Sequence, residues 1–136
     1  MVGKLYGRTR GEPLPDDEKQ SVRGLLGAHD PFRDLRVDMP LQYVTAFLLV
    51  ALEEGEGVTH YAERAGVSKS VMSRHLHDIG DADRAGKEGF GLVEHRPHPT
   101  ELRAREIYLT PKGRAVVHKI TRAWQMGNWR PKDDRG

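Results

Sequence analysis

Hydrophobic positions recur at three- and four-residue spacing in five stretches of the chain, and this periodicity predicts five helices. The stretches cover about residues 16–28, 38–55, 59–65, 68–79 and 112–124. Almost the whole surface from Val44 to Leu52 is apolar, so we expect the second helix to be central.

Capping signals predict the ends of the first two helices. Asp16 is placed to cap the first, and Gly27 followed by Pro31 predicts its end. Asp30 to Asp38 is then expected to be a connector, and the second helix is expected to begin at Asp38.

The third and fourth predicted helices are separated by a tight turn. Thr59 is placed to cap the third, and Gly66 suits a left-handed position at its end, where a Cβ would be costly. Val67 is expected to be a buried plug, and Ser68 to cap the fourth helix. This order predicts a helix-turn-helix.

A hairpin is predicted between the fourth and fifth helices. Leu92 to Arg96 and Arg105 to Leu109 form its strands, and Pro97 and Pro99 rigidify the turn. Thr110–Pro111 is a cap followed by proline at the first helical position. The fold class predicted is mainly α with a small β-hairpin: a winged helix-turn-helix (α+β) with short terminal helices.

The domain boundaries follow from composition. Residues 1–15 hold three glycines and two prolines among basic residues, which predicts a flexible basic arm. Residues 16–126 form the winged-helix domain with its flanking helices, and 127–136 a flexible tail.

The outward face of the fourth helix carries the candidate DNA-reading residues. Met72, Leu76 and Ile79 are expected to face inward, with Val71 between the two faces. Short polar and basic side chains are suited to phosphates and base edges in a major groove. The candidates are Ser68, Lys69, Ser70, Val71, Ser73, Arg74 and His77. The alternative is an ordinary solvated helix face, and the preceding helix, glycine turn and hairpin favour DNA.

The hairpin tip adds a second cationic group. Arg96, Arg103 and Arg105 cluster there and suit the negative potential of a minor groove. The alternative is a solvated loop whose arginines pair with Glu94, Glu101 and Glu106, and both can hold.

Composition excludes several function classes. The 136 residues carry a formal net charge of +2 and contain no cysteine, so disulfides, Cys-based zinc sites and Cys nucleophiles are absent. No apolar stretch is long enough to cross a bilayer, and no apolar run follows the basic N-terminus as in a secretory signal. We expect a soluble cytoplasmic protein.

Catalytic and metal chemistry find little support. His75 and His77 lie two apart on a helix and point in different directions, and no acidic-and-His set has ligand spacing around His95 and His98. Neither a phosphate-cradling glycine loop nor a Ser–His–acid arrangement is present. We expect no enzyme activity, no cofactor and no metal.

The two motifs together resemble the MarR family of bacterial transcription regulators over residues 38–115. Thr59 to Ile79 is similar to the family's helix-turn-helix, and Gly91 to Ala115 to its wing. Glu101 and Arg103 stand for the family's Asp-x-Arg pair, with Glu in place of Asp. The loop at 80–89 is longer than the family's junction, and one helix follows the wing where the family has long terminal helices.

The resemblance implies a homodimer on a pseudo-palindromic double-stranded DNA site. It gives Arg103 the minor-groove role and the helix from Ser68 to His77 the major-groove role, and it allows a small-molecule effector. Dimer candidates are Leu25, Leu26, Val116, Val117, Ile120 and Trp124, each with an intrachain core position as its alternative.

The leading hypothesis is therefore a repressor-like transcription regulator. Two others stay open: a winged-helix protein-interaction or phage-type assembly module, and a DNA binder without sequence preference. A steep dependence on salt without sequence preference would distinguish the last of these.

Overall fold

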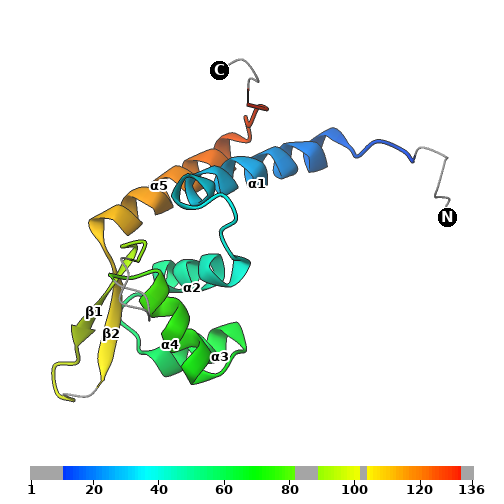
Figure 1. Ribbon diagram of the computed structural model, residues 1–136. Helices are drawn as coiled ribbons and strands as arrows, with labels where there is room; N and C mark the ends of the chain where they lie inside the picture. The colour runs from blue at the N-terminus through cyan, green and yellow to red at the C-terminus, as the bar shows by residue number, and fades with distance from the viewer. Residues whose placement is uncertain (1–10, 82–88, 102–103, 133–136) are drawn as a thin grey trace.

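The computed structural model describes residues 11–81, 89–101 and 104–132. These form α1 (Asp16–Leu35), α2 (Leu41–Leu52), α3 (Val58–Ala65), α4 (Lys69–Asp78), β1 (Val93–Pro97), β2 (Arg105–Leu109) and α5 (Pro111–Met126). Figure 1 shows two lobes: α1 and α5 lie side by side in a terminal lobe, and α2, α3, α4 and the hairpin form a recognition lobe. In this part of the chain no helix is long and apolar enough to span a membrane.

The core lies mainly in the recognition lobe. Phe47, Tyr61, Leu76, Ile79 and Ile107 have no exposed surface, and they come from α2, α3, the end of α4 and β2. Phe47 also meets Phe32 of α1 edge-to-face, with the ring centroids 5.7 Å apart. The predicted central position of the second helix is confirmed, because α2 contacts α3, α4 and β2.

The turn between α3 and α4 follows most of the sequence signals. Gly66 adopts the left-handed conformation with φ 72°, and Ser68 Oγ accepts a hydrogen bond from the Val71 N–H at 3.2 Å. Two predictions are wrong. Val67 is 37% exposed, so it is no buried plug, and α3 begins at Val58 with Gly57 rather than Thr59 as its N-cap.

The first helix is longer than predicted. It starts at Asp16 with Pro15 as its N-cap, and it continues through Gly27 and Pro31 to Leu35. The predicted cap at Asp16, the predicted stop and the connector from residue 30 are therefore all wrong. The physical reason is tertiary packing. A Cβ at Gly24 would lie 2.7 Å from the Trp124 backbone oxygen, so small residues here let α1 and α5 approach closely. Pro31 and Phe32 are buried beyond that contact.

The second helix begins later than predicted, at Leu41, with Pro40 as its N-cap. Asp38 lies before it and accepts a hydrogen bond from Arg36 Nε at 2.8 Å. That hydrogen bond holds the pKa of Asp38 below its usual value. The carboxylate is therefore paired within the short segment between α1 and α2 and does not cap α2.

The hairpin is antiparallel, with Val93 opposite Leu109 and Pro97 opposite Arg105. A single residue, Thr110, separates it from α5, and its Oγ1 caps the helix by accepting from Gly113 N at 3.0 Å, as predicted. Pro111 occupies the first helical position, also as predicted.

Glu54, just after α2, joins three elements. Its Oε1 accepts from the Leu109 N–H of β2 at 2.9 Å and from Arg114 Nη2 of α5 at 2.8 Å. The end of α2, the last residue of the wing strand and the first turn of α5 are therefore tied together by one carboxylate.

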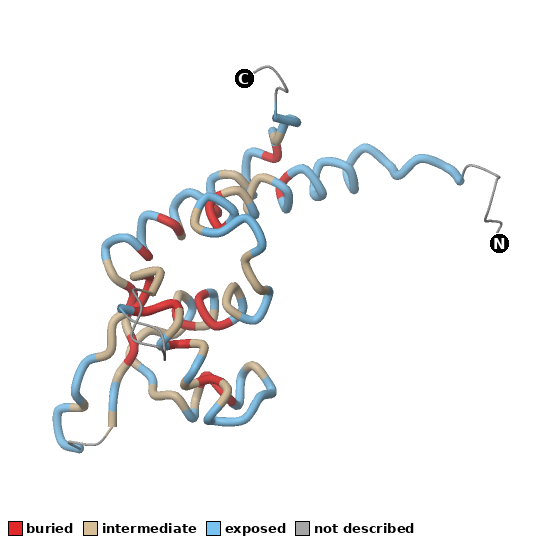
Figure 2. Tube along the Cα trace, in the orientation of Figure 1, coloured by how far each residue is buried: buried red, intermediate tan, exposed pale blue. Residues whose placement is uncertain are grey.

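Residues 127–132 run back along α1. Gly127 turns the chain with φ 57°, Gln20 Nε2 donates to the Met126 oxygen at 3.2 Å, and Lys132 Nζ lies 3.8 Å from Asp30 Oδ2. Figure 2 shows that the first half of α1 nevertheless stays exposed almost throughout.

Candidate nucleic-acid interface

The outward face of α4 is polar, basic and accessible. Ser70, Arg74 and His77 follow one another at i, i+4 and i+7, so they form one row along the helix, and all three are exposed. Met72 and Leu76 anchor the opposite face in the core. The remaining candidates on this helix lie around the row: Ser68 and Lys69 are exposed at the N-terminal end, while Val71 and Ser73 are half-buried at the sides. The predicted division into an inner and an outer face therefore holds within α4.

The C-terminal end of α4 is fixed from behind. Asp78 Oδ2 accepts a hydrogen bond from Tyr43 Oη of α2 at 2.6 Å, and the Tyr43 ring meets those of His75 and Phe90 edge-to-face. Burial lowers the pKa of His75, more than the nearby Asp78 carboxylate raises it. These contacts orient the outward row without occupying it.

A groove of about 310 Å³ lies where α3, α4 and the wing meet. Gly57, Val58 and Thr59 line it at the start of α3, with Lys69 from the start of α4 and Arg105 from β2. Two cations from different elements therefore face one concavity at the N-terminal end of the outward row. Sequence reasoning named both residues separately, and only the fold brings them together.

The two faces of the hairpin differ in chemistry. Arg96 lies on the face away from that groove, 4.0 Å above the Tyr108 ring, and its Nε donates to Glu94 Oε2 at 3.2 Å. That hydrogen bond raises the pKa of Arg96, and the Tyr108 hydroxyl is held in turn by Glu106 at 3.0 Å. The sequence left open whether wing arginines pair with acidic neighbours, and this pairing is observed for Arg96.

The other wing face carries His95, whose ring stacks on that of His77 with centroids 5.0 Å apart and planes 16° apart. This contact joins β1 directly to the outward row of α4. Sequence reasoning weighed His95 only as a metal ligand. The signal that could have found it is the two-residue alternation of the strand, which places His95 and Arg105 on one face.

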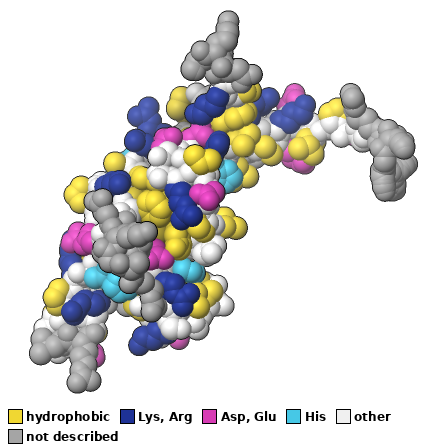
Figure 3. Space-filling model, viewed as in Figure 1, with side chains coloured by type: hydrophobic (Ala, Val, Ile, Leu, Met, Phe, Trp, Pro, Cys, Tyr) yellow, Lys and Arg dark blue, Asp and Glu magenta, His cyan; other side chains and the backbone are white. Residues whose placement is uncertain are grey.

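The tip of the wing is partly described. His98 Nδ1 accepts from the backbone N–H groups of Thr100 and Glu101 at 3.1 and 3.2 Å, which stabilises the turn. Arg103, the predicted minor-groove residue, lies outside the described residues. Figure 3 shows Lys and Arg side chains over both lobes, and hydrophobic side chains along the terminal helices and in the middle of the molecule.

No group of three or more His, Asp or Glu residues within the described ranges could hold a metal ion. The buried residues of that part of the chain are apolar or glycine and proline, with no buried charge in the core. The interface is thus a surface rather than an enclosed site.

Comparison with solved structures places this architecture. No protein-family model matches the sequence, and no curated protein is similar to it at a significant level. A MarR-like transcriptional regulator from Thermotoga maritima superposes with a TM-score of 0.55 and 24% identity over 67% of this chain and 59% of its own. The transcriptional regulator Tm0710 from the same organism superposes with a TM-score of 0.59 and 20% identity, over 81% of this chain and 68% of its own.

The chain has a MarR-type winged-helix fold. A mutant of MarR from E. coli, solved in complex with operator DNA, superposes with a TM-score of 0.54 and 14% identity, over 82% of this chain and 68% of its own. The resemblance expected from the sequence is thus confirmed at the level of the fold. This chain spans only 59% of the first Thermotoga regulator.

Proposed function

We propose that this protein is a DNA-binding transcription regulator of the repressor type, acting as a homodimer on double-stranded DNA. Helix α4 reads the major groove through Ser70, Arg74 and His77, and the wing from residue 96 to 105 contacts the minor groove. The observation that carries the proposal is the exposed row on α4, which continues into the cationic groove at Lys69 and Arg105.

The geometry supports division of labour within this surface. Arg74 lies mid-row, where a guanidinium can form a bidentate contact with a guanine edge. Lys69 and Arg105 flank a groove at the N-terminus of α3, where free backbone N–H groups and cations suit a phosphate. Arg96 is held by Glu94 and Tyr108 and contributes least.

The proposed homodimer uses the terminal lobe. Val116 and Ile120 are buried within the chain and Val117 is half-buried against the core, whereas Leu25, Leu26 and Trp124 are 46%, 37% and 51% exposed. Isolated exposed apolar residues are ordinary, but these three are carried by two helices that pack against each other. A second copy of the chain covering them would complete the lobe.

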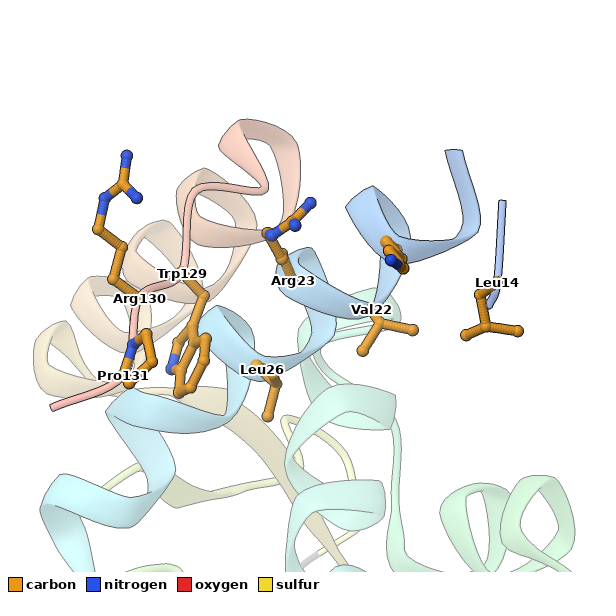
Figure 4. Close-up of a pocket in the computed structure, with 8 residues that line it drawn as sticks. Leu14, Val22, Arg23, Leu26, Trp129, Arg130 and Pro131 are labelled. Carbon is orange, nitrogen blue, oxygen red and sulfur yellow. The ribbon is translucent and has the colours of Figure 1, made fainter. Parts of the chain in front are cut away.

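Charge suits the same pairing. A groove of about 350 Å³ lies between α1 and residues 129–131, and Figure 4 shows Leu14, Val22, Leu26 and Trp129 pointing to one side of it. Lys19, Arg23 and Arg130 border this groove, and Asp16, Asp17 and Glu18 form the first turn of α1. Antiparallel α1 helices would set the acidic turn of one copy against the cations of the other.

Selection from a random duplex pool tests the function directly. We expect enrichment of a pseudo-palindrome whose half-sites lie about one helical turn apart, as two symmetry-related helices require. Binding of every sequence equally, with affinity falling steeply as salt rises, would instead make the protein a non-specific DNA binder. Absence of binding at low salt would favour the interaction module.

Matched variants test the assignment of residues. On the selected duplex, R74A is expected to cost about 1–3 kcal/mol and to relax preference at one base position. K69A and R105A should weaken binding to all sequences and reduce the salt dependence, because they remove phosphate contacts. R103A tests the minor-groove role that the family resemblance implies. R33A, in α1 away from α4, is the control. If R74A, K69A and R105A lost no more DNA affinity than R33A, the assignment would be refuted.

Light scattering tests the dimer. A dimer at micromolar concentration is expected, R23E should dissociate it, and D17K combined with R23E should restore it if the two charges meet. A wild-type monomer, or an R23E variant as dimeric as the wild type, would contradict this use of the terminal lobe.

A further inference from the structure

The stacked imidazoles of His77 and His95 lie where the recognition helix meets the wing. His77 ends the outward row of α4 and is exposed, while His95 lies beneath it on β1 and is half-buried. Parallel rings at 5.0 Å fix the direction of the His77 side chain, because each ring occupies the space into which the other would turn. Two protonated rings would repel each other in this stack.

We propose that this pair holds a single proton when the protein is on DNA, carried by His77 toward the phosphates, and that His95 is the neutral positioning residue beneath it. The inference rests on the proposed DNA-binding function. It makes DNA affinity depend on pH through one identified residue, and it assigns His95 a role that its half-buried position would not suggest.

The surroundings decide which ring takes the proton. Burial lowers the pKa of His95 most, and the neighbouring His77 lowers it further; Asp81 opposes them, and Arg105 of β2 adds the smallest lowering effect. His77 is exposed, and the nearest full charges along its own helix are Arg74, three residues earlier, and the adjacent Asp78, which accepts a hydrogen bond from Tyr43. His75 and Lys69 lie further back on the same helix. The buried ring is therefore held neutral, and the accessible His77 ring is the one that can meet a phosphate.

DNA supplies the reason for proton uptake. Phosphates near the end of the outward row favour the charged form of His77, so binding raises its proton affinity and the complex takes up a proton. By linkage, affinity must then rise as the pH falls through the ordinary range of histidine titration. A neutral ring below the imidazolium gives the stack a favourable partner.

The test measures affinity for the selected duplex between pH 6 and pH 8 at constant ionic strength. Wild type is expected to bind about threefold to tenfold more tightly at pH 6, since a pKa rise of one unit gives a factor of ten. H77Q should lose this difference. H95A should lose at least half of it, because the His77 ring is no longer held outward, and H95F should restore it with another flat neutral ring.

The control is H118Q, on the exposed side of α5 and outside the interface, which should keep the wild-type difference. An H77Q variant that keeps the full pH difference would overturn the inference. An H95A variant that keeps it would overturn the positioning role of His95.

NMR titration of the free protein separates this inference from the function on which it rests. The His95 ring should titrate below the ordinary range of histidine in the wild type, because burial and the neighbouring His77 lower its pKa. In H77Q the His95 titration should move upward, since a neighbouring positive charge is gone. If no variant binds DNA, the proposed function fails. If the two rings titrate independently, the coupled pair fails, whatever DNA does.

Discussion

The recognition lobe and the terminal lobe differ in where fully buried apolar side chains lie: among the described residues, those with no exposed surface belong to the recognition lobe. Phe47, Val50 and Leu76 of the recognition lobe have no exposed surface, while Val22 and Leu25 of α1 are each more than 40% exposed. The recognition lobe encloses a core of its own, although Leu41, Leu48, Leu52 and Val67 of the same lobe are also exposed. The terminal lobe keeps α1 and α5 together through small residues and leaves apolar side chains at its surface.

This difference separates two tasks. A rigid core behind α4 lets the outward row hold its geometry, as recognition of base edges requires. An open apolar surface on the terminal helices is what association with a second copy would use. Stability within one chain and association between chains should therefore respond to different substitutions.

Truncation of the central aromatic residue gives the largest expected effect. F47A should lower the free energy of unfolding by about 3–5 kcal/mol, because it leaves a cavity among side chains that cannot close over it. L25A, at an exposed position of the terminal lobe, should change it by less than about 0.5 kcal/mol in the monomer. Urea denaturation at low protein concentration measures both, and similar losses would mean that the two lobes do not differ.

The close approach of α1 and α5 gives the second effect. Replacing a helical glycine by alanine ordinarily stabilises a helix by about 0.5–1 kcal/mol. G24A should instead destabilise the protein by about 1–3 kcal/mol, because the new Cβ would meet the Trp124 backbone oxygen. G11A, with nothing within 4 Å of its Cβ, is the control. Thermal unfolding decides the sign, and a stabilised G24A would show that the helices are not packed so closely.

The cap of the recognition helix gives a smaller effect. S68A should cost about 1 kcal/mol, because the Val71 N–H loses its side-chain acceptor. S21A, on the exposed part of α1, should stay within about 0.5 kcal/mol of the wild type. Denaturation midpoints compare the two, and equal midpoints would mean that the cap does not contribute to α4.

The smallest effect is the pH dependence of stability in the recognition lobe. The pKa of His95 is lowered in the folded protein, chiefly by burial, so folding favours the neutral ring. Its contribution is complete above the ordinary pKa of histidine and is lost as the pH falls below that value. Between pH 7.5 and pH 5.5, the free energy of unfolding should fall less in H95F than in the wild type. H29Q, on the exposed side of α1, should lose as much as the wild type.

How far the sequence predicted the structure depended on whether local signals or tertiary contacts decided each feature. Gly66, Ser68 and Thr110 act through their own neighbours in the chain, and all three were predicted correctly. Gly27 and Pro31 are local stop signals too, yet α1 continues through them because α5 packs against it. A single sequence does not contain that contact in any local pattern.

The candidate site shows the same division. The outward residues of α4 follow from helical periodicity, so they could be named in advance. Three pairings instead depend on how the hairpin packs: Lys69 with Arg105, His77 with His95, and Arg96 with Tyr108. Those pairings join residues far apart in sequence, and periodicity alone does not specify them.

The carboxylate of Glu54 has a mechanical consequence. It holds the last residue of β2 and the first turn of α5 at once, and only Thr110 lies between those two elements. Because the connection is so short, the wing and α5 should move together as one unit that pivots at the end of α2. In a dimer, tilting α5 would move both wings and change the distance between them. A change far from the DNA would therefore alter the spacing of the two α4 helices.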